Sequence, residues 1–311
     1  MTKFLIRVSV SFLIILYLSL KIDYKIFVQA FREIDILFYL LSAIIAISAS
    51  IFKAGKFYLF IKNTSLSLPI YRLLAINFIA RFYSLIIPTS LGPAMVRWYK
   101  VTENKKGRSF FLASTMVERL FFLLILLLFG TIPLFFYNDN QQIIMLRQRL
   151  VPLLAIAYIL LSGALIYFLF SGPQELLKQL IRKFITIKKD SKFDIFLNNF
   201  SLKNSSLSLI SALFVLSLLW QIFFLTRMFF LFSAMDLPFS IIDVTWMGSL
   251  VLLLQVLPIS FAGIGVREGA YAYLFTLFGL PSEQGFLIGI LFFSQMLIFA
   301  GIGAVLNLFE K

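Results

Sequence analysis

The chain contains neither cysteine nor histidine among its 311 residues. Without cysteine it has no disulfide and no thiol nucleophile, and without histidine it has no imidazole general base and no His-ligated metal. Acidic residues number only 14, against 28 Lys and Arg, and none of them form an Asp-x-Asp pair. No Gly-x4-Gly-Lys-Ser/Thr nucleotide-binding motif occurs either. We therefore expect no metal, no cofactor and no catalytic centre of these kinds.

Apolar residues are abundant, at 61% of the chain, and 38 residues are Phe. Soluble domains contain roughly 45–50% apolar residues, so the composition predicts a polytopic membrane protein. The longest polar run, from Gly172 to Ser206, is too short for an independent domain. We therefore expect one integral membrane domain over residues 1–311. The net charge of +14 is explained by loops that set topology and attract anionic lipid headgroups, rather than by nucleic-acid binding.

The apolar stretches predict an all-α polytopic protein with about 7–8 hydrophobic segments. The stretches of about 20 residues or more are Ile36–Phe60, Ser109–Tyr137, Val151–Phe170, Leu207–Met235 and Gly285–Phe309, and the shorter ones are Val8–Leu20, Leu73–Ile87, Val244–Leu257 and Ala270–Leu280. A full crossing needs about 20 residues, so Leu73–Ile87 favours a re-entrant segment. Val8–Leu20 is nevertheless expected to be an uncleaved first transmembrane helix, and Ala270–Leu280 is counted as a crossing. Lys53 and Lys56, near the end of Ile36–Phe60, are expected to reach the membrane interface.

Two irregular stretches interrupt the apolar pattern, 170 residues apart. The second contains Pro258, Gly263, Gly265, Arg267 and Glu268, and the first contains Pro88, Gly92 and Arg97, with Pro and Arg at matching positions. Irregular backbone at membrane depth is tolerated where it is buried in protein or lines a cavity, and two such breaks point to a site between structural repeats. We therefore predict two broken or re-entrant hairpins and possible inverted-repeat halves at 36–170 and 207–309. The alternative is a pair of kinked helices.

Glu118 and Arg119 form a second unusual pair, ten residues into a long apolar segment. At 1.5 Å per residue they lie roughly 15 Å deep, where each charge costs at least about 2.5–3.5 kcal/mol unless it is paired or hydrated. Adjacent residues of a helix point in different directions. Their expected partners are therefore Arg97, Arg81 or a bound anion.

The distribution of Lys and Arg predicts a cytoplasmic N-terminus. The run 171–206 is a basic cytoplasmic loop in this orientation, and few basic residues fall outside: Lys21, Lys25, Arg32, Arg147 and Arg149. Two arrangements remain for the last third. A re-entrant segment at Asp243–Gly263 predicts inverted repeats with the C-terminus outside, whereas a full crossing there returns the C-terminus inside.

These motifs resemble the flippase-like transmembrane family that is related to the membrane domain of lysylphosphatidylglycerol synthase. The resemblance rests on Pro88-x3-Gly92-x4-Arg97, on the Glu118-Arg119 pair, on the stretch from Leu257 to Gly269 and on Phe278-Gly-Leu-Pro281. It covers nearly the whole chain. One departure is Pro93-Ala94 after Gly92, where the family usually has a Gly-Gly or Gly-Asp-like pattern. The chain has no region matching the large aminoacyl-transfer domain of the bifunctional relatives.

The resemblance implies translocation of a lipid across the cytoplasmic membrane without aminoacylation, in a cell-envelope role. Arg97 and Arg267 are the expected ligands of an anionic headgroup, because a guanidinium matches phosphate oxygens. Glu118 and Glu268 would neutralise the arginines or contact a cationic headgroup, and Arg119 belongs to the same expected site. The expected substrate is an anionic phospholipid or a polyprenyl-phosphate-linked lipid.

Two other classes of protein stay open. An integral membrane enzyme of lipid or glycolipid modification would depend on Glu118 or Glu268 alone, because the remaining acids form no cluster in the sequence. A scaffold of cell-envelope biosynthesis would have no need for charges at mid-depth. The oligomeric state, the lipid and the driving force are not specified by the sequence.

Overall fold

The computed structural model describes residues 2–62, 66, 68–87, 92–102, 108–138, 140–167, 169, 207–257 and 259–309. Within these residues the chain forms eleven α-helices, one 3-10 helix and no strand, so the predicted all-α class is confirmed. The elements are α1 (Thr2–Lys21), α2 (Tyr24–Arg32), α3 (Ile36–Ile61), α4 (Ile70–Ser84), α5 (Gly92–Thr102), α6 (Arg108–Thr131), η1 (Ile132–Phe136), α7 (Gln141–Ile166), α10 (Leu207–Ser233), α11 (Ile241–Val256), α12 (Val266–Thr276) and α13 (Ser282–Phe309). The predicted basic loop 171–206 lies outside the described residues, as do Pro88 and Pro258.

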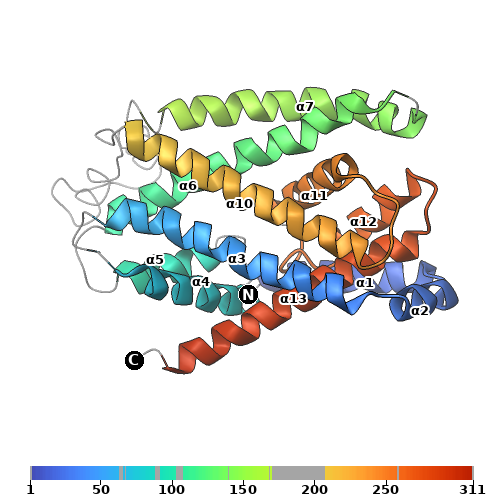
Figure 1. The fold of residues 1–311 in the computed structure, drawn as a ribbon, viewed down its shortest axis with the longest axis horizontal. Helices are drawn as coiled ribbons and strands as arrows, with labels where there is room; N and C mark the ends of the chain where they lie inside the picture. The colour runs from blue at the N-terminus through green and yellow to red at the C-terminus, as the bar shows by residue number, and fades with distance from the viewer. Residues whose placement is uncertain are drawn as a thin grey trace.

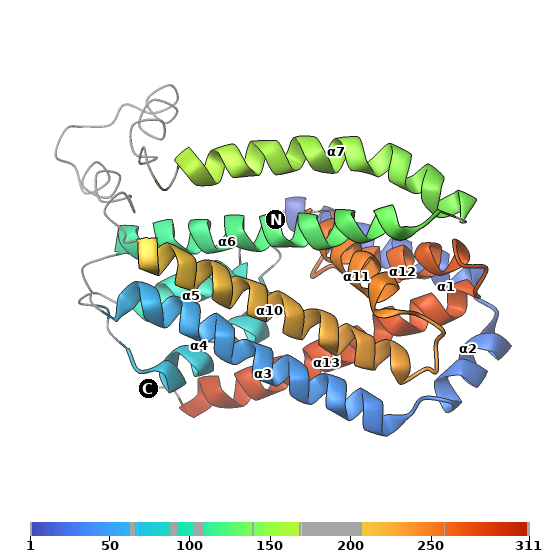
Figure 2. The same cartoon turned by 45° about the horizontal axis from the view of Figure 1, so that its top comes forward.

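Five of these helices are long and apolar enough to cross a membrane, namely α3, α6, α7, α10 and α13. Figures 1 and 2 show them side by side along the long axis of the molecule. We call the two ends of this bundle the Leu207 end, where α10 begins, and the Ser233 end, where α10 finishes. α6 and α10 run toward the Ser233 end, whereas α3, α7 and α13 run toward the Leu207 end (Figure 1).

Short polar side chains start several helices, because each caps backbone N–H groups that the first turn leaves unpaired. The Asp35 carboxylate accepts from the N–H of Leu37 at 2.7 Å at the start of α3. Ser240 and Asp243 form a reciprocal capping box at the start of α11. The side chain of Asn140 accepts from the N–H of Ile143 at the start of α7. That cap places the start of α7 ten residues before Val151, where the apolar stretch was predicted to begin.

The two irregular stretches each connect a pair of short helices that enter the bundle from opposite ends. The pair α4 and α5 lies at the Leu207 end, and the pair α11 and α12 lies at the Ser233 end (Figure 1). α3 packs along α10, α4 packs along α13, and α11 packs along α6. Both α3–α6 and α10–α13 therefore consist of a long helix, a pair of short helices and a second long helix. The corresponding helices of the two sets run in opposite directions along the bundle (Figure 1). This pattern matches the arrangement expected of inverted halves.

The last third combines features of the two predicted arrangements. The pair α11 and α12 is re-entrant, yet α13 finishes at the Leu207 end, where α10 begins (Figure 1). The prediction that a re-entrant segment would put the C-terminus on the opposite side of the membrane from the start of α10 was therefore wrong. It counted Ala270–Leu280 as a crossing, whereas most of that stretch is the returning arm α12. Only α13 crosses after the hairpin.

Glycines of α13 let neighbouring helices approach closely, as small residues do in membrane bundles. A Cβ at Gly289 would lie 2.8 Å from the Cα of Glu268, and one at Gly285 would overlap the carbonyl oxygen of Tyr271. Gly303 faces the carbonyl oxygen of Phe78 on α4 in the same way. These contacts hold α12 and α4 against one face of α13 and so fix the position of Glu268.

Candidate functional site

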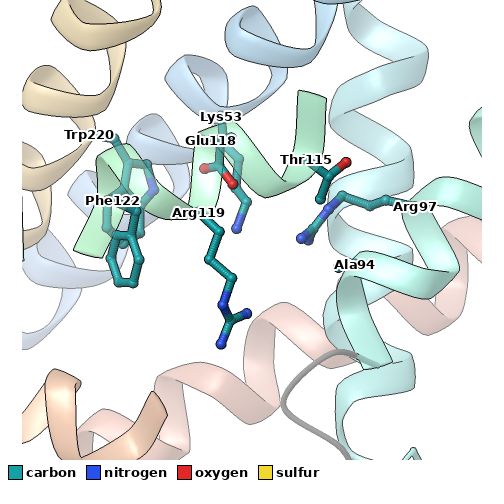
Figure 3. A pocket seen from close by; sticks show the side chains of 8 residues that line it. All are labelled: Lys53, Ala94, Arg97, Thr115, Glu118, Arg119, Phe122 and Trp220. Atoms are coloured by element: carbon teal, nitrogen blue, oxygen red, sulfur yellow. The ribbon is translucent and has the colours of Figure 1, made fainter. Parts of the chain in front are cut away.

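A cavity of about 110 Å³ lies where α3, α5, α6 and α10 meet. Its lining consists of Lys53, Ala94, Arg97, Thr115, Glu118, Arg119, Phe122 and Trp220. Figure 3 shows the side chains of Arg97 and Arg119, from α5 and α6, extending into the space between these helices. Charged residues thus line one part of the cavity and aromatic rings line another.

Glu118 of α6 forms a buried ion pair with Lys56 of α3. The Lys56 Nζ lies 2.6 Å from the Glu118 Oε1, and the two side chains are 1% and 11% exposed. The prediction that Lys53 and Lys56 reach the membrane interface was therefore wrong for Lys56. Lys53, one turn earlier on α3, instead lines the cavity. The packing of α3 against α6 turns both amines inward.

The other cations of the cavity have no carboxylate partner within the described part of the chain. Arg97 is 8% exposed, and its Nε is buried without a hydrogen-bond partner. Its guanidinium lies 5.3 Å from the centre of the Phe57 ring, and the Lys53 Nζ lies 6.0 Å from that of Trp220. Aromatic faces attract cations but do not neutralise them. Among the described residues, Lys53, Lys56, Arg97 and Arg119 thus stand against the one carboxylate of Glu118, and positive charge is in excess around the cavity.

The cavity lies deep in the bundle. Glu118 is ten residues from the start of α6 at Arg108, which corresponds to about 15 Å of helix, and it lies within the candidate membrane span Ser114–Phe136. Each uncompensated charge at this depth costs about 2.5–3.5 kcal/mol or more. Such a cluster persists where an anion or water compensates the charge. The arrangement can therefore bind a multiply oxygenated anion.

The second irregular stretch builds a different kind of site. Gly263 and Gly265 have φ of 77° and 84°, which glycine adopts without strain, and Gly265 directly precedes α12. The Gly265 N–H donates to the Glu268 Oε2 at 2.7 Å, and the Arg267 guanidinium donates to the Glu268 Oε1 at 3.0 Å from Nε and more closely from Nη2. Arg267 and Glu268 are 0% and 2% exposed. The two charges of this pair therefore neutralise each other, and solvent does not reach them.

The structure thus brings together three of the five predicted charged site residues. Arg97, Glu118 and Arg119 line one cavity, whereas Arg267 and Glu268 form a separate pair. Gly92 is the first residue of α5, the helix that carries Arg97. The direct partner of Glu118 is Lys56, not the expected Arg97 or Arg81.

Sequence reasoning missed Lys53, Thr115 and Trp220 as lining residues. It also placed no helical stretch over Gly92–Thr102, which the structure shows as α5. A signal for α5 was present, because Pro is well tolerated in the first turn of a helix. No comparable signal marks Trp220, whose position depends on the packing of α10. In the part of the chain that the structure describes, no group of three or more His, Cys, Asp or Glu is placed to hold a metal ion.

Comparison with known proteins connects this architecture to one family. The family model of the lysylphosphatidylglycerol synthase TM region matches residues 4–303. A search of curated proteins gave no match, and neither did a search of solved structures. The family match covers nearly all of the helical bundle, including both irregular stretches and the cavity. The chain is therefore a multi-pass membrane protein that belongs to the family of the lysylphosphatidylglycerol synthase transmembrane region.

Proposed function

We propose that the protein moves an anionic lipid, either a phospholipid or a polyprenyl-phosphate-linked lipid, across the cytoplasmic membrane. In this proposal the headgroup phosphate binds in the cavity between Lys53, Arg97 and Arg119. The observation that carries the proposal is the excess of buried and half-buried cations over carboxylates around this cavity, among the residues that the structure describes. Family membership supports a role connected with membrane lipids.

The side chains of the cavity suit a phosphate group. Arginine presents a planar fork of N–H donors that fits two phosphate oxygens, and charge-assisted hydrogen bonds of this kind are about twice as strong as neutral ones. The Arg97 Nε is buried without a partner, so one donor is ready for an oxygen ligand. The hydroxyl of Thr115 already donates its proton to the carbonyl oxygen of Phe111 at 2.9 Å. The arginines are therefore the principal donors to a phosphate in this cavity.

The Lys56–Glu118 ion pair sets how tightly the headgroup is held. It occupies Glu118, which otherwise would be free to pair with Arg97 and compete with phosphate. It also keeps one negative charge beside the cavity, which weakens the binding of an anion. A transport site must bind its substrate well enough to admit it and weakly enough to release it.

The location of the cavity also fits transport. Sites of transporters with inverted repeats lie near the midplane, beside broken helices whose backbone lines the route. Here Arg97 comes from α5, directly after the first irregular stretch. The sequence contains no nucleotide-binding motif, so a gradient or mass action would drive the movement.

The test is transbilayer movement of fluorescently labelled lipids in proteoliposomes. An anionic phospholipid, a zwitterionic phospholipid and a polyprenyl phosphate are compared, each with wild type, with Arg97→Gln plus Arg119→Gln, and with Arg149→Gln. Arg149 is an exposed arginine of α7 and provides the matched control. We expect wild type and the control to move one anionic class, and the double variant to lose at least about tenfold in rate, since two charge-assisted contacts are removed.

Two results would overturn the proposal. One is that folded wild-type protein moves none of the three lipids under an imposed proton or sodium gradient. The other is that the double variant moves the anionic lipid as fast as the control does.

A further inference from the structure

A second group of buried arginines lies beyond the cavity, where α4, α10 and α13 meet. Arg227 of α10 is 6% exposed, and Arg81 of α4 is half-buried. Both lie over the buried ring of Phe299, with guanidinium carbons 5.8 and 5.0 Å from its centre. The two guanidinium carbons are therefore no more than about 11 Å apart, close enough for their charges to repel each other in a protein interior.

The same face of α13 extends this group to the second irregular stretch. Phe292 lies two helical turns before Phe299, and its ring centre is 4.1 Å from the Arg227 guanidinium carbon and 5.1 Å from that of Arg267. Arginine and phenylalanine thus alternate from Arg81 to Arg267. Arg267 has the carboxylate of Glu268. Neither Arg81 nor Arg227 has a carboxylate partner among the residues that the structure describes.

The neutral partners of these two arginines leave hydrogen-bonding capacity unused. The Arg81 Nη2 donates to the Ser50 Oγ at 3.0 Å, and the Arg227 Nε donates to the Gln295 Oε1 at 2.8 Å. The Arg227 Nη2, however, is buried without a partner, and so are both amide atoms of Asn77. Asn77 precedes Arg81 by one turn of α4, so the two side chains share a face. Unpaired buried donors of this kind cost free energy unless a ligand or water satisfies them.

One face of α10 links this group to the cavity. Trp220 lines the cavity, and its Nε1 is buried without a partner, as are the two amide atoms of the adjacent Gln221. Trp220 and Arg227 are seven residues apart on the helix, about two turns, so they share a face and lie roughly 10 Å apart along the axis. Since α10 runs toward the Ser233 end, Arg227 lies nearer to that end than the cavity does.

From these observations we propose that Arg81 and Arg227 form a second site for a phosphate-type anion, one step nearer to the Ser233 end than the cavity. This inference deepens the proposed function and rests on it: a headgroup phosphate would pass from Arg97 to Arg81 and Arg227. The chemistry recognised is that of a phosphate monoester or diester. Its source is either a lipid headgroup or free phosphate, and the experiment separates the two.

The first measurement counts bound anions by native mass spectrometry of the full chain in detergent. Short-chain phosphatidylglycerol and inorganic phosphate are titrated separately onto wild type, Arg227→Gln, Arg81→Gln, Arg97→Gln and the control Arg149→Gln. We expect two saturable phosphatidylglycerol molecules on wild type and on the control, and one on each of the other three variants. If inorganic phosphate fills both sites whereas phosphatidylglycerol fills only one, the second anion site is kept but is assigned to free phosphate.

The second measurement is lipid movement by the same variants in proteoliposomes. We expect Arg227→Gln to retain the molecule bound at the cavity yet to lose at least about tenfold in rate. If Arg227→Gln is not monodisperse, Arg227→Lys replaces it. That variant keeps the charge but not the donor fork, so the second lipid should bind about tenfold more weakly.

The second site is refuted if wild type binds no more than one anion, or if Arg227→Gln and Arg81→Gln both keep two and move lipid at the wild-type rate. In that case lipid movement by wild type still upholds the proposed function. Conversely, wild type that binds two phosphate anions but moves no lipid retains the second site and refutes transport.

Discussion

Replacement of Glu118 by Gln tests the electrostatic balance of the cavity most directly. The change removes the carboxylate that lies 2.6 Å from the Lys56 Nζ and leaves an ammonium that is 1% exposed without a counter-charge. Loss of one partner from a buried ion pair typically costs 3–5 kcal/mol, because the remaining charge stays desolvated. Lys53, Arg97 and Arg119 would also lose the carboxylate that lines their cavity. We therefore expect Glu118→Gln to be destabilised by about 3–5 kcal/mol.

The assay is reversible unfolding in mixed detergent, followed by tryptophan fluorescence. Glu33→Gln, at an exposed acid directly after α2, is the matched control and should change the free energy of unfolding by less than about 0.5 kcal/mol. The double variant Lys56→Met plus Glu118→Gln should recover most of the loss, since replacing both partners leaves no unpaired charge in the pair. The reasoning is refuted if Glu118→Gln unfolds like the control, or if the double variant is no more stable than Glu118→Gln alone.

Two further predictions concern packing and topology. Gly303→Ala should separate α13 from α4, because its Cβ would overlap the carbonyl oxygen of Phe78. We expect it to lower the free energy of unfolding by about 1–3 kcal/mol. Gly301→Ala is the control and should not lower it, because no neighbouring atom lies within 4 Å of a Cβ at that position. Equal stabilities of the two variants would contradict this close approach. In the cysteine-free chain, a single cysteine in place of the exposed Leu308 should react with an impermeant thiol reagent only after lysis of whole cells, and one in place of the exposed Tyr24 should react before it. Reaction of both from the same side would contradict the placement of α2 and of the C-terminal end of α13 at opposite ends of the bundle.

The sequence predicted those parts of the fold that depend on local pattern. Apolar stretches of sufficient length gave α3 and α10 to within a few residues, and the short stretches with Pro and Gly gave the two broken hairpins. The helix α5 was missed, because Gly92-Pro93 and the nearby basic residues are also typical of a loop. The returning arm α12 was taken for a crossing, since length alone does not say whether a short apolar helix turns back.

The site was predictable to the extent that single residues were unusual. Glu118 and Arg119 stand out because charges are rare in the middle of an apolar segment. Lys56 does not stand out, because a lysine near the end of one helix is equally compatible with the interface. Its burial follows from the packing of α3 against α6, across 62 residues of sequence, and no local pattern records that contact. The same holds for Arg227, whose surroundings come from α13 and α4.

The two halves of the bundle differ in where the counter-charge of their arginine comes from. Arg267 is followed by Glu268, which belongs to the same helix and stays beside it whatever α12 does. Arg97 is followed by Trp98, and the carboxylate that shares its cavity among the described residues is Glu118 on another helix, which Lys56 on a third helix already binds. Any movement of α3 relative to α6 therefore changes whether Glu118 is held by Lys56 or is free to approach Arg97. The proposed transport function needs a difference of this kind, since a transport site must bind its substrate in one state and release it in the next.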